Sequence, residues 1–203
     1  MSHVFSIPIL SGSLNQPVLS IRATFLKYLL QLILSPCNGW EDIEKAALPP
    51  SRLLGRGLFP LMALAAVSVF AQALFLHHVV IKTLFMRMII TFVVYFISYF
   101  LSTFVLSLTS LVAESPQPDE DERAQTFTIY TLGLLSLISI VVNLLPVTPL
   151  VLFFLPCYVA LVQWKGCGYM RVPEGKQGVF MSVAILGVLL PPYILYFVFS
   201  FIF

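Results

Sequence analysis

Charged residues are scarce in this chain. Its 203 residues include 11 Lys and Arg and 9 Asp and Glu, so only 10% are charged and the net charge is +2. A soluble domain carries roughly 25% charged residues, and a nucleic-acid-binding surface needs clustered basic side chains with interleaved aromatics. The scarcity of charge therefore excludes an ordinary soluble domain, and we expect no nucleic acid among the partners.

Signatures of enzymes and metal sites are also lacking. The sequence has no HExxH or GxSxG motif and no pair of aspartates inside an apolar run. Cys37, Cys157 and Cys167 show no paired spacing, so we expect packing side chains instead of a metal site or disulfides. His77 and His78 would point about 100° apart on a helix, with no third ligand nearby. We therefore predict a protein that is not an enzyme and binds no cofactor.

Apolar runs, in contrast, are abundant, since 59% of the residues are hydrophobic and the mean hydropathy is +0.98. About 20 apolar residues cross a hydrocarbon core of roughly 30 Å as a helix. Alternating barrel strands are not apparent, so helices must satisfy the backbone. We predict an all-α integral membrane protein with five transmembrane helices. The expected spans, which make residues 58–203 one transmembrane domain, are 58–76, 84–113, 126–143, 147–164 and 179–203.

Residues 1–57 form the predicted cytoplasmic N-terminal segment. Within residues 21–34, Thr24, Lys27 and Gln31 fall at spacings of three and four, opposite an apolar face. The pattern predicts an amphipathic helix too short to span a bilayer, which either lies in the membrane interface or packs on the bundle. Trp40 follows it at the expected depth of the lipid headgroups.

Two further polar stretches are expected outside the spans. Asn38 is predicted to cap a short helix with acidic residues in its first turn. The acidic run of residues 119–122 lacks the glycine turn of a calcium-binding loop, so we predict a solvated loop there.

The basic residues predict the orientation. All Lys and Arg except Lys82 and Arg87 fall in segments that are cytoplasmic if the N-terminus is inside. This bias favours a cytoplasmic N-terminus and a C-terminus on the opposite side. The basic side chains also suit contact with anionic lipid headgroups. The residues we expect at the membrane interface or as topology determinants are Lys27, Trp40, Arg52, Arg56, Trp164, Lys165, Arg171 and Lys176.

Prolines interrupt the later apolar runs. A tight hairpin is expected where Pro146 and Pro149 separate the third and fourth spans. Pro156 should kink the fourth span, and Pro191 and Pro192 should break the fifth, because proline removes a backbone hydrogen bond and clashes with the preceding turn. Many transporters use such unwound backbone around their substrates. A transporter or lipid-handling protein is therefore the alternative to a non-enzymatic membrane organiser.

Three stretches carry a family resemblance. LSPCNGWEDI (34–43), LLGRGLFPLMAL (53–64) and YVALVQWKGCGYMRVPEGK (158–176) resemble the approach to the first span, its entry and the exit from the fourth span in the Yip family. These are the Ypt/Rab-interacting membrane proteins of the Yip-one domain type. The resemblance covers most of residues 25–203, although the proline that many members have soon after a tyrosine is missing after Tyr130.

The resemblance implies five spans, a cytoplasmic N-terminus and partners recruited at the cytoplasmic face. In eukaryotic members it implies vesicle traffic with prenylated small GTPases. The short N-terminal region points instead to a bacterial inner-membrane member with an unknown protein partner. We expect membrane lipids as further partners, with a homo-oligomer as an open option.

Overall fold

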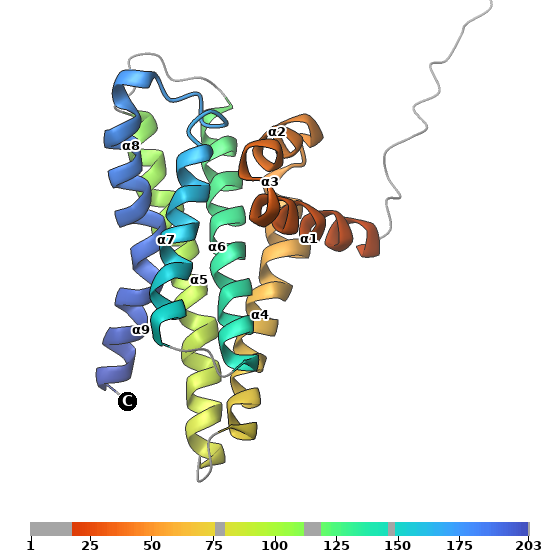
Figure 1. Cartoon of the computed structure of the whole chain (residues 1–203), viewed down its shortest axis with the longest axis vertical. Helices are drawn as coiled ribbons and strands as arrows, with labels where there is room; N and C mark the ends of the chain where they lie inside the picture. Colours follow the sequence, from red (N-terminus) through yellow and green to blue (C-terminus); the bar gives the residue numbers. More distant parts are fainter. Residues whose placement is uncertain (1–17, 76–79, 112–118, 146–148, 203) are drawn as a thin grey trace, which may run out of the picture.

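The computed structural model describes residues 18–75, 80–111, 119–145 and 149–202, and within these ranges the chain is helical almost throughout, without a strand (Figure 1). Four helical stretches are long and apolar enough to cross a membrane: Pro50–Leu74, Ile81–Leu108, Glu120–Leu144 and Glu174–Ile202. The all-α prediction is thus confirmed. Helix α7 (Pro149–Lys165) has 17 residues, or about 25 Å at 1.5 Å per residue, and is not among these four.

The bundle alternates in direction along the chain. Its first stretch consists of α3 (Pro50–Leu53), the π-helical η1 (Leu54–Leu58), α4 (Phe59–Ser68) and the 3-10 segment η2 (Val69–Leu74). The following elements are α5 (Ile81–Leu111), α6 (Glu120–Leu144), α7, η3 (Glu174–Lys176), α8 (Gln177–Ala184), the π-helical η4 (Ile185–Leu189) and α9 (Leu190–Ile202). Consequently the start of α6 and the end of α7 lie at the same end of the bundle (Figure 1).

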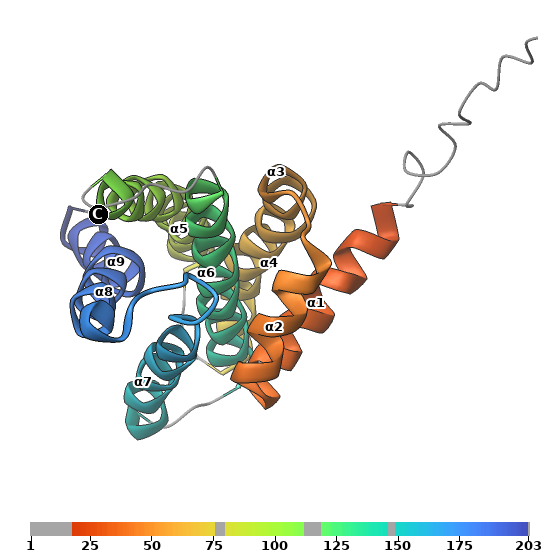
Figure 2. The ribbon, with the colours of Figure 1, turned by 90° about the horizontal axis from the view of Figure 1, so that it is seen from above.

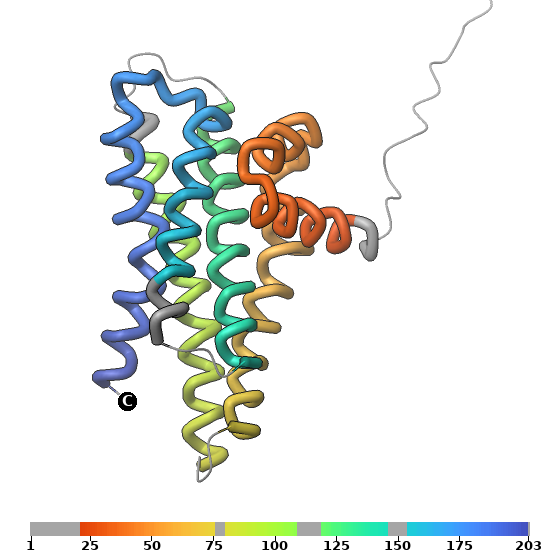
Figure 3. The backbone as a smooth tube through the Cα atoms, viewed as in Figure 1, coloured from red at the N-terminus to blue at the C-terminus, as the bar shows by residue number. Residues whose placement is uncertain are grey.

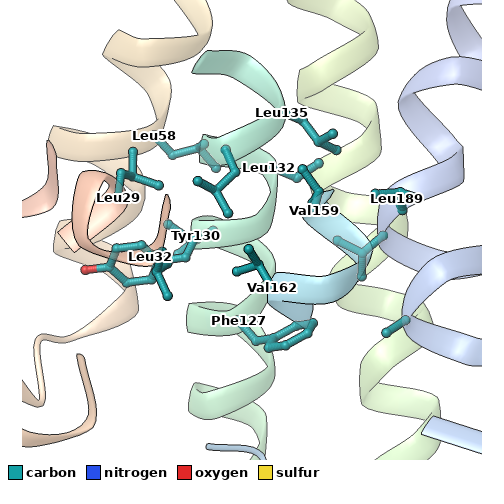
Figure 4. Packing of buried hydrophobic residues seen from close by; sticks show 14 of the residues in the cluster. Leu29, Leu32, Leu58, Phe127, Tyr130, Leu132, Leu135, Val159, Val162 and Leu189 are labelled. Carbon is teal, nitrogen blue, oxygen red and sulfur yellow. The ribbon is translucent and has the colours of Figure 1, made fainter. Parts of the chain in front are cut away.

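Helix α6 forms the centre of the bundle. In its most apolar window 67% of the residues are buried, compared with 28–39% in the other three candidate spans. Its side chains Phe127, Tyr130 and Leu132 meet residues from α1, α4, α7 and η4 in one buried cluster (Figure 4). The other helices therefore pack around α6 and keep one face toward the surroundings.

Two helices lie outside the bundle axis. Helix α1 (Val18–Leu34) crosses the bundle almost at a right angle, and α2 (Pro36–Ala46) lies above it (Figures 1 and 2). The buried face of α1 contains Ile21, Phe25, Leu29 and Leu32. The Gln31 side-chain amide donates a hydrogen bond to the Asp42 carboxylate of α2. The Tyr158 hydroxyl of α7 donates to the Ile33 carbonyl, so both α2 and the bundle hold α1.

Glycines allow α1 to approach the bundle closely. A Cβ at Gly57 would lie 2.7 Å from Cγ of Phe25, and one at Gly133 would lie 3.1 Å from Cδ2 of Leu29. Any larger residue at these positions would push α1 away from η1 and α6. The level of α1 along the bundle is therefore fixed by the positions of two glycines.

Helical backbone continues through the prolines that we expected to break the spans. Pro156 lies inside α7, and Pro191 and Pro192 lie in the first turn of α9 (Figure 3). The backbone is therefore not unwound at these three positions, and the break expected at Pro191 and Pro192 is wrong. The Leu190 N–H donates to the Ile185 carbonyl, so the turn before Pro191 is a π turn. Such a widened turn relieves the clash between the proline ring and the preceding carbonyls.

Some residues predicted in turns or caps lie inside helices, and others lie outside the described residues. Pro149 is the first residue of α7, whereas Pro146, His77 and His78 lie outside the described residues. The prediction that Asn38 caps a helix is wrong, because α2 begins at Pro36, whose fixed φ suits a first helical position.

The acidic run is also not a loop. Glu120, Asp121 and Glu122 form the first turn of α6, where negative charge is stabilised by the helix dipole.

Substituting Gly57 tests the docking of α1. Gly57→Ala should destabilise the detergent-solubilised protein by about 1–3 kcal/mol, because its methyl group would collide with the buried Phe25 ring. Gly55→Ala is the matched control in the same segment, since nothing lies within 4 Å of a Cβ there. Unfolding followed by circular dichroism measures both. Equal stability of the two variants would contradict the close docking of α1.

Candidate functional site

Three segments that are distant in sequence meet at one end of the bundle. They are α2, residues 119–127 at the start of α6, and the loop 166–173 after α7, and we call them together the cap. All three lie at the upper end of the molecule in Figure 1. The ion pairs that join described side chains distant in sequence all lie in the cap, so it is the candidate site.

Trp40 holds the cap together. Its indole N–H donates to the Val162 carbonyl over 2.9 Å, and the side chain is only 2% exposed. The ring stacks on Phe127 with centroids 5.2 Å apart and on Tyr169 with centroids 5.3 Å apart. A Cβ at Gly166 would lie 3.0 Å from the indole, so glycine leaves the space that the ring fills. A single side chain of α2 thus contacts α6, α7 and the loop.

Arg123 makes the charged connections of the cap. Its Nε donates to Asp119 over 2.9 Å and its Nη2 to Glu44 over 3.0 Å. Its Nη1 donates to the Tyr169 carbonyl over 2.7 Å, and the guanidinium lies 5.3 Å from the centre of the Tyr169 ring. Only 14% of the Arg123 side chain is exposed. Because charge-assisted bonds strengthen when water is excluded, this residue fixes α2, α6 and the loop relative to one another.

Arg171 extends the same network at the surface. Its guanidinium lies 3.5 Å from Glu44 and 3.8 Å from Asp119, with 60% of the side chain exposed. Pairs this exposed contribute about 0–1 kcal/mol each. Arg171 therefore adds to the charge pattern of the surface more than to its stability.

The cap shifts the pKa values of two of its groups. The hydrogen bond from Arg123 is the main cause that lowers the pKa of Asp119 below its ordinary value of 3.8. Burial raises the pKa of the Tyr169 phenol. At neutral pH Asp119 is consequently a carboxylate, which accepts the hydrogen bond from Arg123, and Tyr169 is a neutral phenol.

A depression of about 180 Å³ opens between α2, α3 and the start of α6. Leu48 and Leu53 give it an apolar wall, and Glu44, Asp119 and Glu122 contribute carboxylates. Tyr130, which also lines it, reaches from α6 toward the N-terminal helices (Figure 4). The Tyr130 hydroxyl is buried and has no hydrogen-bond partner among the described residues.

The predicted interface residues divide into two groups. Trp40 is buried within the protein, so its indole does not face lipid. The exposed residues are Lys27 on α1, Arg52 on α3, Arg56 on η1, Trp164 and Lys165 at the end of α7, Arg171 in the loop and Lys176 on η3. The elements that carry them all lie at the cap end (Figure 1).

The sequence analysis missed the residues that assemble the cap. Glu44 accepts a hydrogen bond from Arg123, which lies 79 positions further along the chain, and Phe127 and Tyr169 stack on Trp40. No local sequence pattern marks contacts between residues so far apart. One local signal was available. Asp119 and Arg123 have the i, i+4 spacing of a helical ion pair, which would have placed the acidic run on a helix.

No protein-family model, no curated protein and no solved structure matches this chain.

Replacing Trp40 should separate the segments of the cap. We expect Trp40→Ala to lower the free energy of unfolding by about 3–5 kcal/mol, because a large buried ring is lost. Trp40→Phe should lose less, about 1 kcal/mol for the bond to Val162, since a ring remains to stack. Trp164→Phe is the control, since Trp164 is 49% exposed. Denaturant titration of the purified protein distinguishes the three, and equal midpoints for Trp40→Ala and Trp164→Phe would refute the role of Trp40.

Acid should loosen the cap through Asp119. A carboxyl whose folded pKa is lowered adds stability that is fully present above its ordinary pKa of 3.8 and is lost as the pH falls through the lower folded value. The measurement is the unfolding midpoint of the wild type and of Asp119→Asn between pH 7 and about pH 2. Wild type should lose its advantage over the variant toward the acid end. A difference that stays constant with pH would show that Asp119 and Arg123 are not coupled.

Proposed function

We propose that this chain is a non-enzymatic multi-pass membrane protein of the Yip type, with a cytoplasmic cap that recruits a protein partner and so organises the membrane around it. The observation that carries the proposal is the cap itself, because Trp40 and Arg123 fix three distant segments into one polar surface at one end of a membrane bundle. Surfaces built in this way suit binding, since the partner meets an ordered site and less entropy is lost.

The proposed placement in the membrane follows the charges. We place the cap in the cytoplasm of a bacterium and the bundle in its inner membrane, because exposed Lys and Arg gather at the cap end. Helix α7 is the fifth span in this arrangement. It ends at Lys165 beside the cap and packs along α6, and a helix of its length crosses where the bilayer thins slightly.

We also place α1 in the cytoplasmic interface. Its axis is nearly perpendicular to the bundle (Figure 1), so it lies parallel to a membrane that the bundle crosses. Leu26, Leu30 and Leu34 are 42%, 54% and 84% exposed on the side away from the core. An exposed leucine ridge with basic neighbours such as Lys27 is the composition of a helix that lies on lipid.

The depression defines the chemistry that a partner would present. Its carboxylates outnumber its single guanidinium, and Glu122 is exposed and makes no ion pair with another described residue. A basic side chain of the partner could pair with Glu122 while its aliphatic part covers Leu48. We therefore expect a partner with a basic segment. The transporter alternative has little support, because the helices continue through Pro156, Pro191 and Pro192.

A charge reversal at the rim of the depression tests partner recruitment. Purified wild-type protein, Glu122→Lys and Glu174→Lys are used as baits in mild detergent against an isotope-labelled membrane extract. The control Glu174 is exposed at the same end but does not line the depression. A true partner should be retained by wild type and Glu174→Lys and reduced at least about tenfold by Glu122→Lys, the loss expected when a favourable charge pair becomes repulsive.

Point variants are preferable to removal of the N-terminal segment. Deleting residues up to 52 would expose the buried Phe127 and Tyr130, and the exposed apolar surface would bind proteins nonspecifically. If Glu122→Lys and Glu174→Lys retain the same proteins in the same amounts, the depression is not the recruiting surface.

A further inference from the structure

Among the described residues, helix α1 contacts the bundle only in the half that carries the cap. It contacts η1 at Gly57 and α6 at Gly133, close to the cap. At the opposite end the described residues contain no helix that runs across the bundle axis (Figure 1). If the bundle spans a bilayer, α1 occupies area in one leaflet only.

The depth of α1 is fixed by its contacts. Tyr130, whose ring lies 5.2 Å from that of Phe25, follows Arg123 by seven residues on α6, so α1 lies about 10 Å deeper than the charges of the cap. On the other side Phe25 contacts Gly57, the neighbour of the exposed Arg56. Helix α1 therefore lies beside the buried pair of Phe25 and Tyr130 and near the exposed Arg56. In a membrane this level corresponds to the boundary between headgroups and acyl chains.

The faces of α1 are suited to this level. Phe25 and Leu29 face the bundle, and Gln31 faces α2 through its bond to Asp42. Leu26 and Leu30 then point outward and away from α2. Leu64 of α4 is exposed as well, and in the proposed placement lipid of the cytoplasmic leaflet covers both.

The docking of α1 is also rigid. The Phe25 ring has no room to move toward Gly57, where even a Cβ would be 2.7 Å away, and Tyr158 holds the other end of the helix by its bond to Ile33. Since α1 has 17 residues, it is about 25 Å long and 10 Å wide and displaces on the order of 250 Å² of lipid from one leaflet. A bilayer that curves toward that leaflet accommodates the added area with less packing stress.

We infer that α1 acts as a wedge in the cytoplasmic leaflet, so that the protein concentrates in membranes that are convex on the cap side. The inference rests on the interfacial placement of α1 under the proposed function, and it adds an activity that needs no protein partner. Lipid is the ligand, recognised by its packing density instead of by a particular headgroup.

The test compares vesicles of one lipid composition and two sizes. Fluorescently labelled full-length protein is reconstituted into a mixture of small sonicated and large extruded vesicles, and protein per membrane area is measured on single vesicles with an outward-facing cap. Wild type should be at least about threefold denser on the small vesicles. Equal densities would overturn the wedge.

Paired serine substitutions show whether α1 is responsible. Leu26→Ser with Leu30→Ser changes leucines that are 42% and 54% exposed, and the control Leu101→Ser with Leu64→Ser changes leucines that are 42% and 55% exposed on α5 and α4. The α1 pair should remove the preference for small vesicles, and the control pair should keep it. A preference that survives in the α1 pair refutes the assignment to this helix.

Photobleaching on the same vesicles counts the copies in each complex. Should the leucine ridge cover a second copy of the chain instead of lipid, the α1 pair would reduce the number of bleaching steps and wild type would show no size preference, which overturns the wedge. Because the vesicles contain no other protein, failure here leaves partner recruitment by the cap untouched. Loss of partner binding in Glu122→Lys leaves the size preference unchanged in turn.

Discussion

The Trp40 side chain makes the contacts on which the cap depends, namely one buried hydrogen bond and two ring stackings. Val162 lies in the last turn of α7, and its carbonyl also accepts from the Gly166 N–H over 3.1 Å. The end of α7 and the start of the following loop are thereby tied to α2. Because the same indole stacks on Phe127 of α6 and on Tyr169 of the loop, one aromatic side chain joins α2 to α6, α7 and the loop.

Contacts of this kind carry special weight in a membrane bundle. Lipid tails are as apolar as leucine, so apolar burial alone does not favour one helix partner over another. Specificity then comes from close approach at small residues and from polar bonds. Lower in the bundle, Gln72 donates to Asn143 over 2.7 Å and Asn143 donates to Ser68 over 2.8 Å, which joins η2 and α4 to α6. Between these levels the Tyr95 hydroxyl donates to the Leu135 carbonyl over 3.0 Å.

The parts of the fold that depend on composition could be predicted from the sequence, and the parts that depend on distant contacts could not. Hydropathy predicts apolar helices, because each helix satisfies its own backbone and meets lipid locally. Trp40 illustrates the limit. A tryptophan beside an apolar span is typical of a membrane interface, yet here its acceptor lies 122 residues further along the chain. The predicted break at Pro191 is wrong for another reason. The prediction assumes an α-helix, in which the proline ring clashes with the preceding turn, but the π turn before Pro191 relieves this clash.

The cap and α1 are mechanically one unit, and this has a thermodynamic consequence. Leu32 of α1 packs against Gly39 of α2, where a Cβ would lie 2.9 Å from its side chain, and Gln31 bonds to Asp42. A partner that binds the cap only when α2 is docked therefore also favours the docked position of α1, which is the position that the proposed function places in the leaflet. By linkage, a membrane that favours docked α1 must favour that partner by the same factor. Under the proposed function, partner recruitment and membrane shape are coupled through the fraction of molecules in which both short helices are docked, because both ligands select the same packing of these helices.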